Sequence, residues 1–383
     1  EAVRPWLESV AGADEPLWSV RPIPRSIVKA HGADAAACAV GYLREYLAEV
    51  RPSSLGLLAQ PAPLNALTHL RLDREAVGHL ELIETSRHGR REGALLAAVD
   101  RTKTAGGARA LRALLLAPLA DRADLQARHT AVEALLDGAR DELRGLLAGG
   151  ADLARMVGRA AAGLVTPREL AAARTTLLTL PAMRQGLERL SPEAPRLGLL
   201  ANALSEGVEI ADRLVELLAD EPKNQLSEGG VIRAGVHREL DDLIELCDDS
   251  TGWLERFTQA QRALLGIATT KVRFNRVAGY GIEVSRAKSH VVPEHYRRVQ
   301  TLKHVERYTT PELSEFEQRL LTAQDQRVAL ESRLYGELTA WLADRSGVLR
   351  RIAGALAELD VHASFATVAV ERGYCRPELQ PEG

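Results

Sequence analysis

Cationic side chains are concentrated in one stretch of the 383-residue chain, between positions 271 and 310. This window carries a net charge of +6, whereas the other 343 residues together carry −9. Its nine cations are Lys271, Arg273, Arg276, Arg286, Lys288, Arg297, Arg298, Lys303 and Arg307. A cluster of this kind is the electrostatic footprint of a surface that binds a polyanion, and its alternative interpretation is a merely solvated basic surface.

Residue patterns for nucleotide hydrolysis are missing from the printed sequence. A Walker A loop needs Gly-Lys followed by Ser or Thr, because glycine amides and the lysine together cradle the phosphates. None of the six lysines follows a glycine. No Ser/His/Asp arrangement can be placed either, so the sequence predicts no enzyme activity and no catalytic residue in this chain.

Metal binding is also disfavoured. The possible ligands are His290, His295 and His304, and the acidic pairs Asp241-Asp242 and Asp248-Asp249. The histidines lie among arginines without the Cys or Asp that would complete a ligand set, so phosphate contact or simple exposure is the better interpretation. The acidic pairs fall on an expected helical face and are interpreted as solvated rather than as a two-metal site.

Composition indicates a soluble, mainly helical protein. Apolar residues make up 46% of the chain, charged residues 26% and aromatic residues only 4%, which disfavours an all-β body. The three cysteines lie far apart, so neither a disulfide framework nor a four-ligand zinc site is expected. No apolar stretch reaches the roughly 18 residues of a membrane span, and the chain start lacks a signal-peptide pattern, so we expect a cytoplasmic protein.

Apolar periodicity predicts a series of helices joined by short polar connections. After a helix from Ser26 to about Arg51, helices are expected over 74–86, 92–100, 105–116, 121–137, 139–158, 167–180 and 208–219. Asp121 and Thr166-Pro167 occupy the positions of helix caps and first turns.

Two longer helices are predicted at 236–267 and from Thr310-Pro311 onward, the first about 48 Å long. Their matching lengths suggest an antiparallel pair that carries the intervening segment at its tip.

That intervening segment alternates with period two and is therefore predicted to be β. One strand pair covers 271–275 and 282–285, with a turn at Ala278-Gly279, and a weaker pair covers 297–302 and 305–309. The predicted fold class is mainly α: a multi-helical core with two long antiparallel helices carrying a small four-stranded antiparallel sheet at their tip.

Several blocks of sequence, in order, resemble the bacterial MutS family of DNA mismatch-recognition proteins. The blocks are Leu72-Asp73 with Leu80-Glu81-Leu82, the run Asp100 to Leu111 (DRTKTAGGARAL) with Pro118, Phe274 to Ile282 (FNRVAGYGI), Gln300 to Tyr308 (QTLKHVERY) with Pro311-Glu312-Leu313, Glu358 to Val361 (ELDV), and Tyr374 to Pro377 (YCRP). Together they span roughly residues 20–380. One departure is Gly281, which stands where an aromatic residue is usual beside Tyr280.

The resemblance implies a domain organisation. Residues 1–20 would be the tail of a connector domain, 21–235 the first part of the helical core, 236–269 and 311–345 two lever helices, 270–310 a β clamp domain, and 346–383 the return to the core and exit toward an ATPase domain. The family's mismatch-reading Phe-x-Glu wedge does not occur in the chain. The resemblance therefore implies the core, lever and clamp portion of a MutS-like protein.

The resemblance also implies function and partners. The clamp would contact the backbone of double-stranded DNA, and the levers would couple its movement to an ATPase domain that binds ATP and Mg in the parent protein. A homodimer, a MutL-like partner and a cytoplasmic, nucleoid-associated location follow in the same way, with no membrane partner.

The residues expected to contact DNA phosphates share positive charge or hydrogen-bonding capacity in the basic window. They are Lys271, Arg273, Asn275, Lys288, Arg297, Arg298 and Lys303. Two alternatives remain: a structural or protein-interaction coiled-coil arm without DNA binding, and a weaker hypothesis of RNA binding. The strands offer few aromatic residues for base stacking, because Phe274, Tyr280, Tyr296 and Tyr308 could equally form the core of the sheet.

Overall fold

The computed structural model of this chain describes residues 35–50, 69–70, 72–275 and 279–380. The chain divides into two compact units, Glu1–Leu64 and Asn65–Gly383. In the first unit the described element is α3 (Ala35–Val50), which agrees with the helix predicted to end near Arg51. The prediction for residues 1–20 lies outside the described residues.

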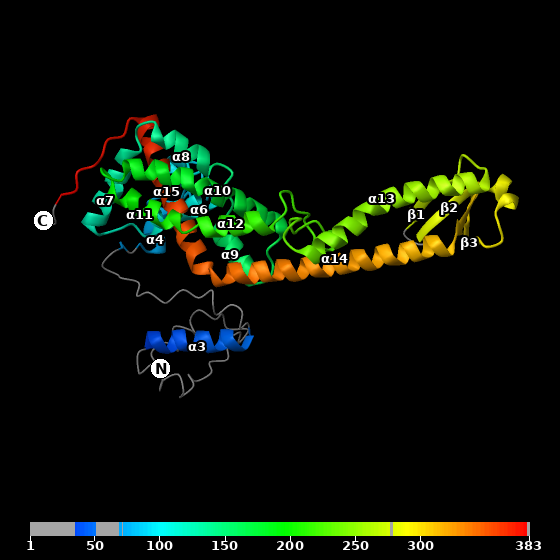
Figure 1. Cartoon of the computed structure of the whole chain (residues 1–383). Coiled ribbons are helices and arrows are strands. Elements are labelled where there is room, and N and C mark those ends of the chain that lie inside the picture. Colours follow the sequence, from blue (N-terminus) through cyan, green and yellow to red (C-terminus); the bar gives the residue numbers. More distant parts are fainter. Residues whose placement is uncertain (1–34, 51–68, 71, 276–278, 381–383) are drawn as a thin grey trace. The chain divides into compact units, whose positions relative to one another are not determined.

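The second unit is mainly helical, as the sequence predicted, with one four-stranded antiparallel sheet (Figure 1). Its shorter helices are α4 (Arg74–His79), α5 (Leu95–Val99), α6 (Ala105–Leu116), α7 (Arg122–Ala134), α8 (Ala139–Leu147), α9 (Leu153–Ala161), α10 (Pro167–Leu190), α11 (Pro195–Ser205), α12 (Val208–Leu217) and η2 (Leu226–Glu228). Its longer helices are α13 (Arg238–Leu265), α14 (Pro311–Asp344) and α15 (Ser346–Arg372). The strands are β1 (Lys271–Asn275), β2 (Gly279–Ser285), β3 (Arg297–Thr301) and β4 (Val305–Thr309), with η3 (Arg286–Val291) after β2. Below, helices α4–α12 and α15 are called the helical body.

The predicted helix caps are present. Asp121 accepts a hydrogen bond from the amide of Asp124, and Thr310 accepts one from Leu313 at the start of α14. Thr166 and Glu169 form a reciprocal capping box at α10. These bonds satisfy amides that the first helical turn leaves without partners, which is why the caps were readable from neighbouring residues alone.

Helix boundaries differ from the prediction in several places. The stretch 139–158 is two helices, because Gly149 has a φ of +75° that ends α8 and Asp152 caps α9. Helix α10 runs to Leu190 with Pro181 inside it, beyond the predicted end at 180, and α11 was not predicted.

A buried carboxylate, Asp360 of α15, joins two distant parts of the helical body. It accepts hydrogen bonds from the Lys103 amide at 2.9 Å, the Thr104 amide at 2.8 Å and the Thr104 hydroxyl at 2.7 Å. A Cβ on Gly107 would lie 2.2 Å from this carboxylate. The Thr-Lys-Thr-Ala-Gly-Gly run therefore supplies amides at the start of α6 and a glycine that gives the carboxylate room to reach them.

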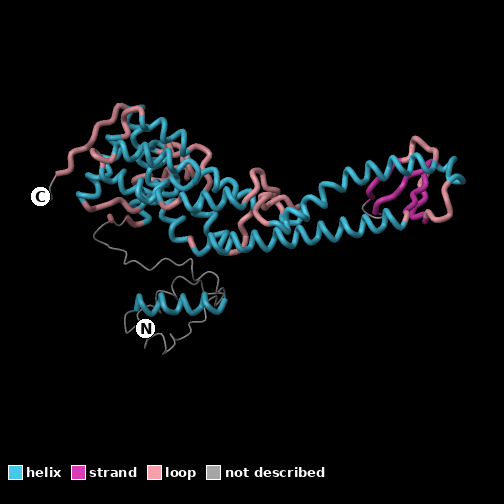
Figure 2. Tube along the Cα trace, viewed as in Figure 1, coloured by secondary structure: helices cyan, strands magenta, loops and turns pink. Residues whose placement is uncertain are grey.

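The sheet packs on two long antiparallel helices, α13 and α14, which we call the long pair (Figures 1 and 2). At 28 and 34 residues they are about 42 Å and 51 Å long, so the first is shorter than predicted and the two lengths do not match. Near the sheet, the rings of Trp253 on α13 and Phe316 on α14 stack with centroids 3.7 Å apart.

In the described part of the chain, α15 is the one helix long and apolar enough to cross a membrane, although the sequence analysis had expected no such stretch. In its most apolar window, 67% of the helix is buried inside the structure. This degree of burial is typical of the core helix of a helical bundle.

Candidate nucleic-acid interface

Strand order gives the basic sheet one apolar face and one polar face. The order is β1-β2-β4-β3, and all three pairings are antiparallel. On the inner face, Ile282, Val284 and Tyr308 are buried with Phe257 and Leu313 of the long pair. Because side chains alternate along a strand, the outer face carries Lys271, Arg273, Glu283 and Arg307 by register.

The centre of the outer face is electrically balanced. Glu283 accepts hydrogen bonds from Nη2 and Nε of Arg307 at 2.6 and 3.0 Å, and Nη1 of Arg307 donates to Gln300 at 3.1 Å. The side chain of Arg307 is only 10% exposed. Arg307, one of the nine cations of the basic window, is therefore committed to an internal ion pair and is not available to a ligand.

The Arg307 side chain lies over Gly281 of β2. A Cβ at Gly281 would meet the aliphatic carbons of Arg307 at 3.4 to 3.6 Å. The resemblance led us to expect an aromatic residue at this position, and the Arg307 side chain covers it instead. Strand β2 continues through this position without interruption.

The exposed cations lie at the two edges of the sheet. Lys271 and Arg273 are on β1 at one edge, and Arg297 is on β3 at the other. The two central strands, β2 and β4, separate these predicted contact residues. Three strand spacings place these edges roughly 14 Å apart. Arg273 lies 3.7 Å from Glu283 and keeps 60% of its side chain exposed.

Two further cations gather at the end of the sheet where β2 finishes and β4 begins. Lys288 lies in η3 and Lys303 in the turn between β3 and β4, and both are exposed. The amide of Arg286 donates to the carbonyl of His304 at 3.1 Å, which ties the start of η3 to that turn. Lys271 starts β1 opposite Glu283, near the same end.

Arg298 does not join the outer face. It opposes Tyr308 and lies 3.6 Å from Glu306, a buried acid that also accepts a 2.5 Å hydrogen bond from the Tyr308 hydroxyl. Burial and Glu306 raise the pKa of Tyr308 to about 12, so its hydroxyl remains a donor. Asn275 is half-buried at the end of β1, and Arg276 and Ala278 lie outside the described residues.

Of the four aromatic residues weighed as core or stacking groups, Tyr296 and Tyr308 are buried and Tyr280 is half-buried. Phe274 is 54% exposed, with its ring 5.1 Å from that of Tyr280. Glu317 of α14, which was not predicted as a site residue, accepts a hydrogen bond from the Tyr280 amide at 3.1 Å. Its acidic type on a predicted helix gave no signal, because the contact is with backbone 37 residues away.

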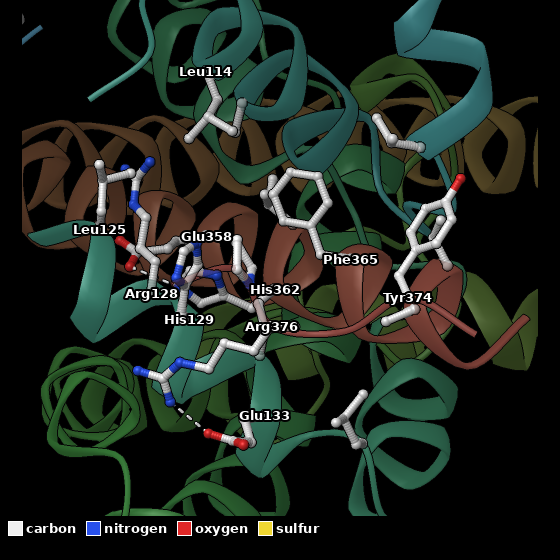
Figure 3. A pocket seen from close by; sticks show the side chains of 18 of the residues that line it. Leu114, Leu125, Arg128, His129, Glu133, Glu358, His362, Phe365, Tyr374 and Arg376 are labelled. Carbon is white, nitrogen blue, oxygen red and sulfur yellow. Dashed lines mark hydrogen bonds and ion pairs between the residues drawn. The ribbon is translucent and has the colours of Figure 1, made fainter. Parts of the chain in front are cut away.

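A separate groove of about 700 Å³ lies on the helical body, between α6, α7, α15 and the segment that follows α15 (Figure 3). Leu114, Phe365 and Tyr374 line its apolar part. Arg376 and Glu133 form an ion pair at 2.5 Å on its rim. No group of three or more possible metal ligands occurs among the residues that the structure describes.

Two titrating groups beside this groove predict acid sensitivity. His362 is 2% exposed and lies 3.2 Å from Glu358, which also pairs with Arg196. Burial lowers the pKa of His362 below its ordinary 6.5 despite Glu358. Burial would raise the pKa of Glu358, but hydrogen bonds from His362 and Arg196 outweigh it and hold this pKa at about 2.

Both groups therefore bind fewer protons in the folded state, so their contribution to stability is present at neutral pH and lost on acidification. The melting temperature should fall as the pH drops below 6.5, with a further loss below the ordinary Glu358 pKa of 4.5. His362→Gln should reduce the first part of this fall, to which His129 also contributes because burial lowers its pKa too, whereas His88→Gln, at an exposed site, should not change it. Parallel curves for all three proteins would contradict the assignment to His362.

Comparison with known proteins agrees with this architecture. The family described as MutS domain III matches residues 75–366. The DNA mismatch repair protein MutS of Chlorobaculum parvum is 40% identical over 350 residues, which are 91% of this chain and 40% of the relative. Those of Synechococcus elongatus and Anaeromyxobacter sp. are each 39% identical, over 90% and 91% of this chain and 39% of the relative. The chain thus spans about two fifths of the length of these curated relatives.

Proposed function

The chain belongs to the MutS family, and from that premise we propose that it serves DNA mismatch repair by gripping duplex DNA through phosphate contacts of its basic sheet. The observation that carries this proposal is the placement of exposed cations at both edges and one end of a sheet whose own acids are already paired. Phosphate contacts position a duplex without reading its sequence.

The proposed contact residues are those of the sequence analysis, namely Lys271, Arg273, Asn275, Lys288, Arg297, Arg298 and Lys303. Their separation across the sheet supports contact with more than one phosphate. One phosphate cannot contact cations roughly 14 Å apart, whereas a duplex carries a phosphate about every 3.4 Å of its axis on each strand, so the separated cations suit a DNA backbone rather than a single anion.

The domain organisation is proposed on the same premise. Residues 236–269 and 311–345 would be lever helices, and 270–310 the clamp. In a longer polypeptide, the levers would couple the clamp to an ATPase domain, with ATP and Mg bound there, and the protein would act as a homodimer with a MutL-like partner in the cytoplasm. This chain's own part in that scheme is to hold the duplex.

Duplex binding tests the proposal. Fluorescence anisotropy with a labelled duplex compares the unmodified chain with the double variant Lys303→Glu, Arg298→Glu. We expect the variant to bind about ten- to a hundredfold more weakly, since Lys303 and Arg298, which stays 60% exposed although it lies beside Glu306, become acids that repel phosphates. The loss should be equal for matched and mismatched duplexes, because backbone contacts carry no sequence information.

The matched control is Arg184→Glu with Arg189→Glu on α10, which changes the net charge equally at exposed sites of the helical body. This control should bind within about twofold of the unmodified chain, because surface charges farther from the duplex than a Debye length are screened. Equal binding by all three proteins would contradict the proposal. A chain that binds no duplex would favour the protein-interaction arm.

A further inference from the structure

The loop that leads into α13, residues 218–237, is held by two buried charges of opposite sign on different helices. We call it the root loop. Its two sides run antiparallel: Leu218 bridges to Ile232, and the amides of Ala219 and Arg233 donate to Val231 and Leu217 at 3.0 and 2.9 Å. It connects the helical body to the long pair, because α13 begins where it ends.

Arg174 of α10 holds the carbonyls of one side of the root loop. Its Nη1 donates to Leu218 and Ala219 at 3.0 and 2.9 Å, and its Nη2 donates to Asp220 at 2.6 Å. Arg174 is buried, and the backbone carbonyls of the root loop supply the acceptors for its donors. The planar guanidinium is suited to several carbonyls at once because its donors have a fixed geometry.

Glu331 of α14 holds the amides of the other side. Its carboxylate accepts hydrogen bonds from Gly230 at 2.9 Å, Val231 at 2.6 Å and Ile232 at 3.3 Å. Arg327, one turn earlier, donates to the same carboxylate at 2.9 Å. Glu331 is fully buried, so losing these bonds would leave polar groups without water.

Two glycines allow the backbone of the root loop to lie close to α14. Gly229 and Gly230 have φ values of +64° and +74°, which side chains rarely adopt. A Cβ at Gly229 would lie 3.3 Å from Arg327 Nε and 3.4 Å from Glu331 Oε1. The loop backbone therefore fits closely against α14 at this level.

Other contacts hold the long pair as well: α14 packs on α9, where the Tyr335 hydroxyl donates to the Val165 carbonyl at 2.9 Å, and further contacts lie at the sheet end. There Trp253 and Phe316 stack, and Glu317 accepts the amide of Tyr280. Between the two ends, the helices leave an open hollow of about 560 Å³ lined by Leu246 and Thr322, and Leu246 is half exposed. The start of α13 is therefore positioned by the burial of Leu240 and by the root loop, which is the part held by hydrogen-bonded buried charges.

We infer that Arg174 and Glu331 are positioning residues that fix the long pair, and with it the basic sheet, relative to the helical body. Arg174 ties the root loop to the body, and Glu331 ties the same loop to α14. Releasing either contact frees α13 to shift along α14, so the sheet samples a wider range of positions. An effect of this range of positions on DNA binding rests on the proposed function. The range of positions itself does not depend on that function.

Distance measurement between spin labels tests the inference without DNA. Labels are placed at Ala287→Cys in η3 and Gln185→Cys in α10, both exposed, after Cys38, Cys247 and Cys375 are replaced by serine. Glu331→Gln keeps the volume of the side chain but removes its charge and one acceptor. We expect the distance distribution to broaden by about twofold, because a population of shifted states appears.

The matched control is Glu337→Gln, also on α14, where the glutamate makes an exposed 3.0 Å pair with Arg333. It should leave the distribution unchanged. Arg174→Lys, which keeps the charge but loses the fork of donors, should broaden it as Glu331→Gln does. Each variant is compared at a temperature where its circular dichroism equals that of the parent, so that partial unfolding is excluded.

An unchanged distribution in both folded variants would overturn the inference. Should Glu331→Gln not fold, hydrogen exchange of the unmodified chain decides. The amides of Gly230, Val231 and Ile232 should be protected as strongly as those of α14, and rapid exchange at these loop amides would refute the positioning role of Glu331.

Duplex affinity is measured separately: weakening by about three- to tenfold in Glu331→Gln is expected if the proposed function holds. A chain with no duplex affinity would refute the proposed function. The distance distributions would still test whether Arg174 and Glu331 position the long pair.

Discussion

Asp360→Ala should lower the free energy of unfolding of the helical body by about 4 kcal/mol, because it strips a buried carboxylate from two amides and a hydroxyl. These donors lie at the start of α6, on chain some 256 residues away, so no nearby group replaces the carboxylate. Urea unfolding followed by circular dichroism measures the change. The control is Asp121→Ala, an exposed helix cap whose loss should cost about 1 kcal/mol.

Gly107→Ala provides an independent check of the same contact. Its added methyl group would lie 2.2 Å from the Asp360 carboxylate and displace it, so we expect a loss of about 2–3 kcal/mol. In the double variant Gly107→Ala, Asp360→Ala, the methyl group has room, and the two losses should not add. Additive losses, or a loss from Asp360→Ala no larger than that from Asp121→Ala, would show that the carboxylate does not hold α6.

Duplex binding should weaken by about 150-fold between 50 and 200 mM salt, because each phosphate contact contributes about −0.9 to the log–log slope and four contacts give about −3.6. The count of four comes from the proposed contact residues. In the described part of the chain, Lys271, Lys288, Arg297 and Lys303 are exposed and have no acid within ion-pair distance, whereas Arg273 and Arg298 each lie near one. Titrations of a labelled duplex at several salt concentrations measure the slope.

The double variant Lys303→Glu, Arg298→Glu should make this slope shallower by about 0.9 to 1.8, according to whether Arg298 contributes a contact. The α10 control variant should keep the slope of the unmodified chain. A flat salt dependence of the unmodified chain would mean that any duplex affinity comes from contacts other than phosphates, and the proposed interface would be wrong.

Much of the fold was predictable because its signals are local. Thr166-Pro167 and Thr310-Pro311 mark the starts of helices, because each threonine satisfies an amide three residues away. The alternating patterns at 271–275 and 305–309 coincide with β1 and β4. Predicted helix boundaries were wrong where local signals compete. Gly149 ends a helix that apolar periodicity would continue, whereas α10 continues through Pro181 although proline usually interrupts a helix.

The candidate site was predictable as a set of residues but not as a surface. Charge counting found the basic window, yet it could not show that Arg307 pairs with Glu283 or that Arg298 lies across from Tyr308 on the inner face. Those facts depend on the strand order, which separates β1 from β3 by two strands. Local alternation predicts strands without predicting which strands are neighbours.

The amino-acid sequence alone determined that this protein is a helical body with a basic β segment between two long helices, because periodicity, caps and net charge are properties of neighbouring residues. Only the tertiary structure decided which charged side chains are buried and paired inside the protein. Asp360, Glu331, Arg174 and Arg307 are buried against partners far along the chain, and a charge can leave water only where the fold brings such partners to it.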